Sequence, residues 1–208
     1  MEDTSTPSIM WYKKVYIAPA VFLFFSAVLL FLPSGFLMII FSASLLHELG
    51  HYAALRLMKG CVKELSITPL GVEMSIEGTL SYGQELLLAA AGPAVNILVA
   101  VILSHMGITW EVCYMISGVH LILGIFNLLP IMPLDGGRLL WNASCWCLGP
   151  YTADRISTIV GVASSCLLTG AALWMLLQGG SPFLLLATVG LLRVPLRQIG
   201  LVKQVQTR

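Results

Sequence analysis

Long apolar runs separated by short polar connections dominate the pattern of this chain. The first run extends from Val15 to Leu32, and the second from Phe36 to about Leu57. A helix needs about 20 apolar residues to cross a hydrocarbon core of about 30 Å, so each of these runs is long enough to span a bilayer. Further apolar runs follow at about 86–105, 111–129, 156–177 and 182–192. The pattern therefore predicts about six transmembrane helices.

The stretch from residue 59 to residue 84 departs from this pattern. Apolar and polar residues alternate there on both sides of a turn at Pro69 to Gly71, which is typical of strands with one apolar face. We expect two short strands that form a small β-hairpin between helices 2 and 3. The expected fold class is thus an all-α polytopic membrane protein with this hairpin added.

Composition agrees with a chain that lies in a lipid bilayer. Of the 208 residues, 58% are hydrophobic and 10% are charged, and the mean hydropathy is +0.90. Water-soluble domains carry roughly a quarter charged residues. The net charge of +1, without a cluster of basic residues, argues against a nucleic-acid partner. We expect residues 1–208 to form a single transmembrane domain.

The basic residues set the expected orientation, because the cytoplasmic flanks of membrane helices collect Lys and Arg. With the N-terminus inside, all 11 basic residues fall on the cytoplasmic side. The outer connections, near 33–35, 106–110 and 178–181, contain none. Both termini and the β-hairpin are therefore expected to be cytoplasmic.

The second apolar run contains the sequence HELGH. On a helix, His47 and His51 lie one turn apart on one face, where they can bind one metal ion, and Glu48 lies beside them. Zinc hydrolases use this spacing, with two neutral imidazoles as ligands and the glutamate as a base. A charged side chain inside an apolar helix costs roughly 2.5–3.5 kcal/mol, which argues for a function. A polar patch between helices, or a proton relay, is the alternative.

A third ligand is expected from another helix at similar depth. Of the ten acidic residues, only Glu48 and Asp135 lie in or beside a break in an apolar run. Pro130 and Pro133 are expected to end the fourth helix, and the Gly-Gly pair after Asp135 allows close backbone approach. Irregular backbone at membrane depth is tolerated where it lines a cavity, so Asp135 is expected to line the metal site. Alternatively, Asp135 caps a helix that starts near Arg138.

Three motifs in this order resemble a known family. HELGH at 47–51, GPAVN at 92–96 and NLLPIMPLDGG at 127–137 are similar to the site-2 protease family of intramembrane zinc metalloproteases, and most similar to its stage IV sporulation protein FB-like group. The resemblance covers nearly the whole chain. Many relatives carry a CBS pair or a PDZ domain, and this chain has neither, which leaves its regulation open and leaves room for a regulatory membrane partner. It also has a single glycine, Gly71, where relatives often have a pair.

The resemblance implies roles for individual residues. It implies that Zn²⁺ is bound by His47, His51 and Asp135, and that Glu48 is the catalytic base. It also implies supporting roles for Asn96, Asn127 and Pro130.

Other polar residues in the apolar runs are less informative. Asn96 is explained equally well by a hydrogen bond between helices and by a role beside the metal ligands or the substrate. His105 is expected at the outer surface and His120 in the packed interior, neither of them as a metal ligand.

The expected activity is hydrolysis of membrane-tethered proteins by a zinc metalloendopeptidase, as in regulated intramembrane proteolysis. At a rise of about 1.5 Å per residue, His47 and His51 lie about 15 and 9 Å from Leu57, which puts the active site in the cytoplasmic half of the bilayer. A scissile amide must be unwound from its helix before it can be cut. The segment around Val72, Glu73 and Met74 is expected to bind the unwound substrate as an added strand.

Two alternatives come from other functional classes. A metal-ion transporter would use the same His and Asp side chains as a transit site, but it would be expected to show internal repeats and a polar path across the bilayer. A non-catalytic helix-binding scaffold would be expected to have lost Glu48, which is present.

Overall fold

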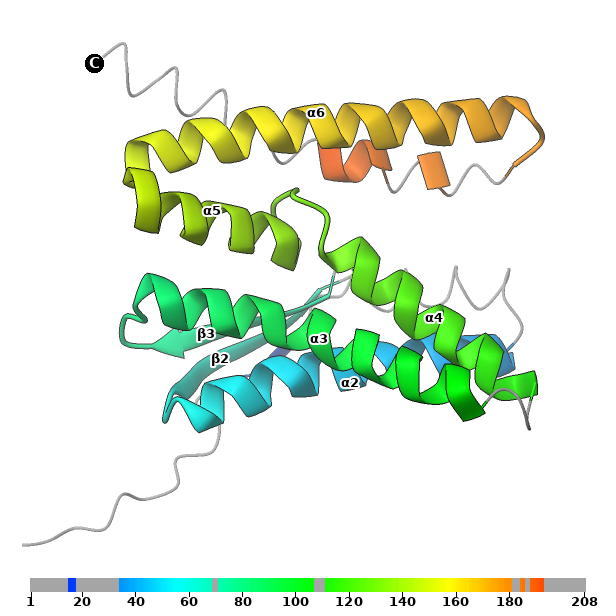
Figure 1. The fold of residues 1–208 in the computed structure, drawn as a ribbon, viewed down its shortest axis with the longest axis horizontal. Coiled ribbons are helices and arrows are strands. Elements are labelled where there is room, and N and C mark those ends of the chain that lie inside the picture. Colours follow the sequence, from blue (N-terminus) through cyan, green and yellow to red (C-terminus); the bar gives the residue numbers. More distant parts are fainter. Residues whose placement is uncertain are drawn as a thin grey trace, which may run out of the picture.

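The computed structural model describes residues 15–17, 34–68, 71–106, 111–180, 184–185 and 188–192. It is mainly helical, with one small sheet (Figure 1). Its elements in chain order are strand β1 (Val15–Ile17), helix α2 (Ser34–Leu57), strands β2 (Cys61–Thr68) and β3 (Gly71–Glu77), and helices α3 (Tyr82–Met106), α4 (Glu111–Asn127), α5 (Asp135–Leu148) and α6 (Pro150–Leu177).

Helix α3 lies at the centre of the helical part. It packs against α2, α4 and α5, and α5 in turn packs against α6. Figure 1 shows α2, α3 and α4 grouped together, with α6 on the far side of α5. The helix that carries HELGH therefore packs directly against the helix that carries GPAVN.

The start of α3 is defined by a reciprocal cap. The Ser81 backbone N–H donates to the Gln84 side-chain oxygen at 2.9 Å, and the Gln84 backbone N–H donates to the Ser81 hydroxyl at 3.4 Å. This pair satisfies two N–H groups that the first turn of a helix leaves without partners. It marks the residue at which α3 begins.

The strands form one sheet in the order β1-β2-β3. Strands β2 and β3 pair antiparallel, with an irregularity between Val62 and Glu64. This pairing agrees with the two strands that the alternating pattern predicts. Within the described part of the chain, β3 is an edge strand, because β2 is its one neighbour in the sheet.

Strand β1 corrects one expectation. The first apolar run was predicted to be helical from Val15, whereas Val15–Ile17 pair in parallel with Leu65–Ile67 of β2. Two β-branched residues and a tyrosine in succession favour a strand when a partner strand is near. The rest of that run lies outside the described residues.

Helix α5 is a second correction, because no apolar run was recognised between 130 and 155. Arg138, Asn142 and Ser144 interrupt its apolar residues, and hydropathy alone therefore missed it. Helix α6 also begins earlier than expected, at Pro150, in a first-turn position that suits the fixed φ of proline. Gly149, with a φ of 84°, lets the chain turn sharply between α5 and α6.

Among the described residues, α2, α3 and α6 are long and apolar enough to cross a membrane, and α4 is a shorter apolar helix. Large apolar side chains are exposed on these helices, as expected for helices that face lipid. Examples are Phe41, Leu98, Ile122 and Trp174. The count of six spans, which includes the run that ends at Leu32, stays a prediction.

Candidate metal centre

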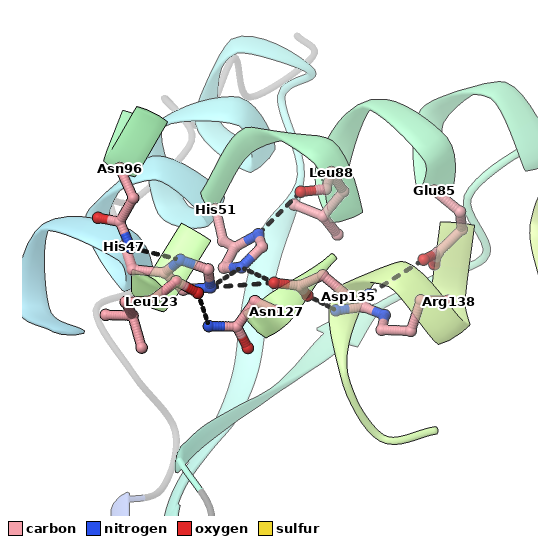
Figure 2. Close-up of polar contacts among 9 residues, drawn as sticks. All are labelled: His47, His51, Glu85, Leu88, Asn96, Leu123, Asn127, Asp135 and Arg138. Atoms are coloured by element: carbon pink, nitrogen blue, oxygen red, sulfur yellow. Dashed lines mark hydrogen bonds and ion pairs between the residues drawn. The ribbon is translucent and has the colours of Figure 1, made fainter. Parts of the chain in front are cut away.

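The three predicted ligands meet between α2 and the start of α5. His47 and His51 come from α2, and Asp135 is the first residue of α5 (Figure 2). Asp135 Oδ2 lies 2.9 Å from His47 Nε2 and 3.1 Å from His51 Nε2, and the two Nε2 atoms are 3.2 Å apart. All three side chains are buried. Three atoms of the kinds that bind metals thus point at one position inside the protein.

The spacing of these atoms suits a tetrahedral zinc ion. Ligand atoms about 2.0–2.1 Å from a tetrahedral Zn²⁺ lie about 3.3–3.4 Å from each other. The three observed separations of 2.9, 3.1 and 3.2 Å are slightly shorter, so a small outward shift of each side chain makes room for the ion. Two imidazole nitrogens and one carboxylate oxygen are also a ligand set that catalytic zinc sites use, with a fourth position left open.

The ring of His51 is held in the tautomer that metal binding needs. His51 Nδ1 lies 2.8 Å from the backbone carbonyl oxygen of Leu88 in α3. A carbonyl oxygen can only accept a hydrogen bond, so Nδ1 carries the hydrogen and donates it. In the neutral ring, Nε2 then keeps its lone pair and is free to bind a metal ion.

Helix α3 also contacts the other histidine, through Asn96. The carboxamide nitrogen of Asn96 lies 3.1 Å from His47 Nδ1, and the carboxamide oxygen lies 3.1 Å from His120 Nδ1 in α4. Asn96 is fully buried. Asn96 links three helices, as one of the two interpretations expected, and it also contacts a predicted ligand; its role at a metal centre stays a prediction.

Glu48 follows His47 in α2 and is partly buried. It interacts electrostatically with both histidines and with Asp135. As a carboxylate, it can accept a proton from a water molecule.

The second oxygen of Asp135 faces a different partner. Arg138, one turn further along α5, places Nη1 3.8 Å from Asp135 Oδ1 and donates from Nη2 to Glu85 Oε2 of α3 at 3.2 Å. Figure 2 shows Arg138 between the two carboxylates. Arg138 therefore ties the first turn of α5 to α3 and leaves Asp135 Oδ2 directed at the histidines.

The alternative role of Asp135 as a helix cap is not what the structure shows. The capping position of α5 is Leu134, and no side chain caps that helix. The Gly-Gly pair after Asp135 acts as predicted. A Cβ at Gly136 would overlap the backbone of Leu128, and one at Gly137 would lie 2.6 Å from Ile131 C. Only glycine lets the start of α5 pack this closely on the preceding loop.

The chain is similar to known proteins in sequence and in fold. Residues 104–170 match peptidase family M50. The chain is 29% identical over 130 residues to the zinc metalloprotease MJ0392 of Methanocaldococcus jannaschii, which covers 59% of this chain and 38% of that protein. It is 30% identical over 138 residues to the stage IV sporulation protein FB of Bacillus subtilis, which covers 64% of this chain and 47% of that protein. About a third of the chain therefore resembles peptidase family M50.

The fold of this chain is also found among solved structures. The site-2 protease from Methanocaldococcus jannaschii superimposes with a TM-score of 0.64 at 22% sequence identity, over 88% of this chain and 89% of that one. By sequence, the chain spans less than half the length of the two curated relatives above.

The other predicted site residues do not belong to the group of three converging side chains. Asn127 ends α4, and its carboxamide donates to the Leu123 carbonyl at 3.0 Å, within its own helix. Pro130 lies in the loop between α4 and α5. Val72, Glu73 and Met74 belong to strand β3, and the structure describes their backbone pairing. Their proposed contacts with a substrate stay a prediction.

Gly92 lies against the predicted ligands, and the sequence analysis did not identify it as a site residue. A Cβ built at Gly92 would overlap His51 Nε2 and would lie 2.7 Å from His47 Nε2. The backbone of α3 at this glycine thus forms one wall of the metal centre. Its position directly before Pro93 in GPAVN was a visible signal, but only the packing of α3 on α2 shows its purpose.

Proposed function

We propose that this chain is an intramembrane zinc metallopeptidase that hydrolyses peptide bonds of membrane-tethered proteins. The observation that carries the proposal is the buried convergence of His47 Nε2, His51 Nε2 and Asp135 Oδ2 beside Glu48. The match of residues 104–170 to peptidase family M50, and the similarity to a protein named zinc metalloprotease, support the same proposal. The intact glutamate argues against a scaffold that binds helices without cutting them.

The residues divide the chemistry between them. His47, His51 and Asp135 would hold Zn²⁺, which when bound makes a water molecule more acidic and polarises a carbonyl group. Glu48 accepts a proton from the attacking water and passes it to the leaving amine, as a general base and then a general acid. The Leu88 carbonyl and Asn96 orient the two imidazoles, and Arg138 orients Asp135.

Zinc-dependent cleavage tests this proposal. The purified chain in liposomes, mixed with a single-span protein that carries a tag on each side, is expected to release a tagged fragment. A zinc chelator is expected to stop release, and added Zn²⁺ to restore it, because the centre has no other source of an activated water. Cleavage that continues at full rate after zinc has been removed and measured as absent would contradict the proposal.

We also propose that both termini are cytoplasmic and that the centre lies in the cytoplasmic half of the bilayer, because the basic residues gather on that side. Single cysteines at Ser34 or Gly179 in a cysteine-free chain should react with an impermeant thiol reagent from outside, and one at Thr207 should not. The opposite labelling would reverse the orientation.

Strand β3 is the segment proposed to hold the substrate. Among the described residues it is one of the two edge strands of the sheet, and the segment that contains it connects α2, which carries the two histidines, to α3, which forms a wall of the centre. An extended peptide can pair with the open side of such a strand through backbone hydrogen bonds. This pairing would keep the scissile amide unwound and within reach of Glu48.

A proline scan of β3 tests this binding mode. Alternate residues of a strand direct their N–H groups to opposite sides, so Glu73 and Ser75 share one side and Met74 faces the other. Proline on the substrate side removes one hydrogen bond and is expected to slow cleavage by about 3- to 10-fold, with zinc content unchanged. Alanine at the same positions, which keeps the N–H, is the matched control. Equal effects at all three positions, or losses that follow zinc release, would exclude strand addition.

A further inference from the structure

His120 is a buried histidine that the proposed chemistry does not use. It lies in the middle of α4 with 2% of its surface exposed, and its Nδ1 contacts the carboxamide of Asn96 at 3.1 Å. The other atom of the same carboxamide contacts His47 Nδ1 at 3.1 Å. A continuous chain of polar contacts thus runs from α4 through α3 to one of the proposed zinc ligands on α2.

Zinc binding at His47 would fix the direction of both hydrogen bonds in this series, from His47 to Asn96 and from Asn96 to His120. If His47 Nε2 binds the metal, the neutral ring carries its hydrogen on Nδ1, which must donate. The Asn96 atom that faces it must then be the carboxamide oxygen. The two ends of a carboxamide exchange places by a half-turn, and their assignment follows from the hydrogen bonds. The metal-bound form therefore has the Asn96 oxygen towards His47 and the Asn96 nitrogen towards His120.

The same reasoning determines the state of His120. A carboxamide nitrogen can only donate, so His120 Nδ1 must accept and its hydrogen must sit on Nε2. In the opposite arrangement, His120 Nδ1 donates to the Asn96 oxygen, and the Asn96 nitrogen donates to His47 Nδ1. That arrangement puts the hydrogen of His47 on Nε2, where it blocks metal binding. The two histidines are thus coupled through one buried side chain.

We propose that His120 is a positioning residue, which holds the Asn96 carboxamide in the direction that keeps His47 Nε2 free to bind zinc. This inference rests on the proposed role of His47 as a zinc ligand. In this proposal, His120 acts on the centre only through Asn96 and contacts neither the metal nor the substrate.

A double-mutant cycle on zinc affinity tests this coupling, with Zn²⁺ and a competing chelator as the probe. Loss of an outer hydrogen-bond partner typically lowers metal affinity by about 10- to 100-fold. We expect a loss in this range for Asn96→Leu and about 10-fold, at its lower end, for His120→Phe. The double variant is expected to bind zinc no more weakly than Asn96→Leu alone, because His120 has no other route to the centre. Losses that multiply would mean that His120 only supports packing.

Ser117→Ala is the matched control for this cycle. Ser117 is also buried in α4, one turn before His120, and its hydroxyl donates to the Ala100 carbonyl of α3 at 2.7 Å. Its loss weakens the contact between the same two helices without touching Asn96. Zinc affinity is expected to stay unchanged in this variant, and a loss equal to that of His120→Phe would overturn the proposal.

Nitrogen NMR of the unaltered chain, labelled with ¹⁵N-histidine, tests the proposal without any substitution. In the zinc-loaded chain, the His120 signals are expected to show an unprotonated Nδ1 and a protonated Nε2. A protonated Nδ1 on His120, with zinc bound, would overturn the proposal. If no zinc binds to the unaltered chain, the proposed function itself fails, and this result is separate from any difference between the variants.

Discussion

Glu48→Gln is expected to lower the rate of peptide cleavage by about 10²- to 10⁴-fold, the range that a general base contributes. The amide has nearly the same shape as the carboxylate but cannot take a proton from water. Glu48 is not one of the three converging ligands, so the zinc content should equal that of the unaltered chain. The measurement is cleavage in liposomes together with elemental analysis of the same samples.

Glu111→Gln provides the matched control. Glu111 is exposed in the first turn of α4, and the same chemical change there should leave both cleavage and zinc content unaffected. Turnover that persists in Glu48→Gln would require another base. Loss of zinc from that variant would make Glu48 a ligand instead.

Gly92→Ala is expected to abolish zinc binding although it adds only one methyl group. The new Cβ would overlap His51 Nε2 and press on His47 Nε2, so both imidazoles would have to leave the positions that the metal needs. Loss of an outer hydrogen-bond partner lowers metal affinity by about 10- to 100-fold, and we expect a larger loss of zinc affinity here. Alanine normally stabilises a helix relative to glycine by about 0.5–1 kcal/mol, so a weaker helix cannot explain the loss.

Gly118→Ala is the matched control for this substitution. Gly118 lies within α4, and a Cβ there meets no atom within 4 Å. It should keep its zinc and its activity. Full zinc occupancy in Gly92→Ala would mean that α3 does not wall the centre as closely as the structure indicates.

The core of the site could be predicted because its signals are local in the sequence. The spacing of His47 and His51 places them on one helix face whatever surrounds that helix. Asp135 was predicted because a carboxylate beside a break in an apolar run needs a reason in a membrane protein. The close packing around the Gly-Gly pair after Asp135 followed from the same reasoning.

The parts that the sequence did not reveal depend on contacts between distant segments. The role of Gly92 appears only when α3 is laid against α2, and the link from His120 to His47 needs three helices in register. Strand β1 and helix α5 were missed for a related reason. Each gains its stability from a partner, β2 in one case and α3 with α6 in the other, and neither stands out by hydropathy.

Zinc content after the loss of a single ligand tests the proposed centre most directly. Asp135→Ala removes the one ligand that comes from outside α2, whereas His105→Ala removes an exposed histidine of α3 that takes no part in the cluster. Elemental analysis of the purified chains is expected to find zinc in the unaltered chain and in His105→Ala, and none above background in Asp135→Ala. Undiminished zinc in Asp135→Ala would contradict the proposed ligand set, and with it the metal centre on which the proposed activity depends.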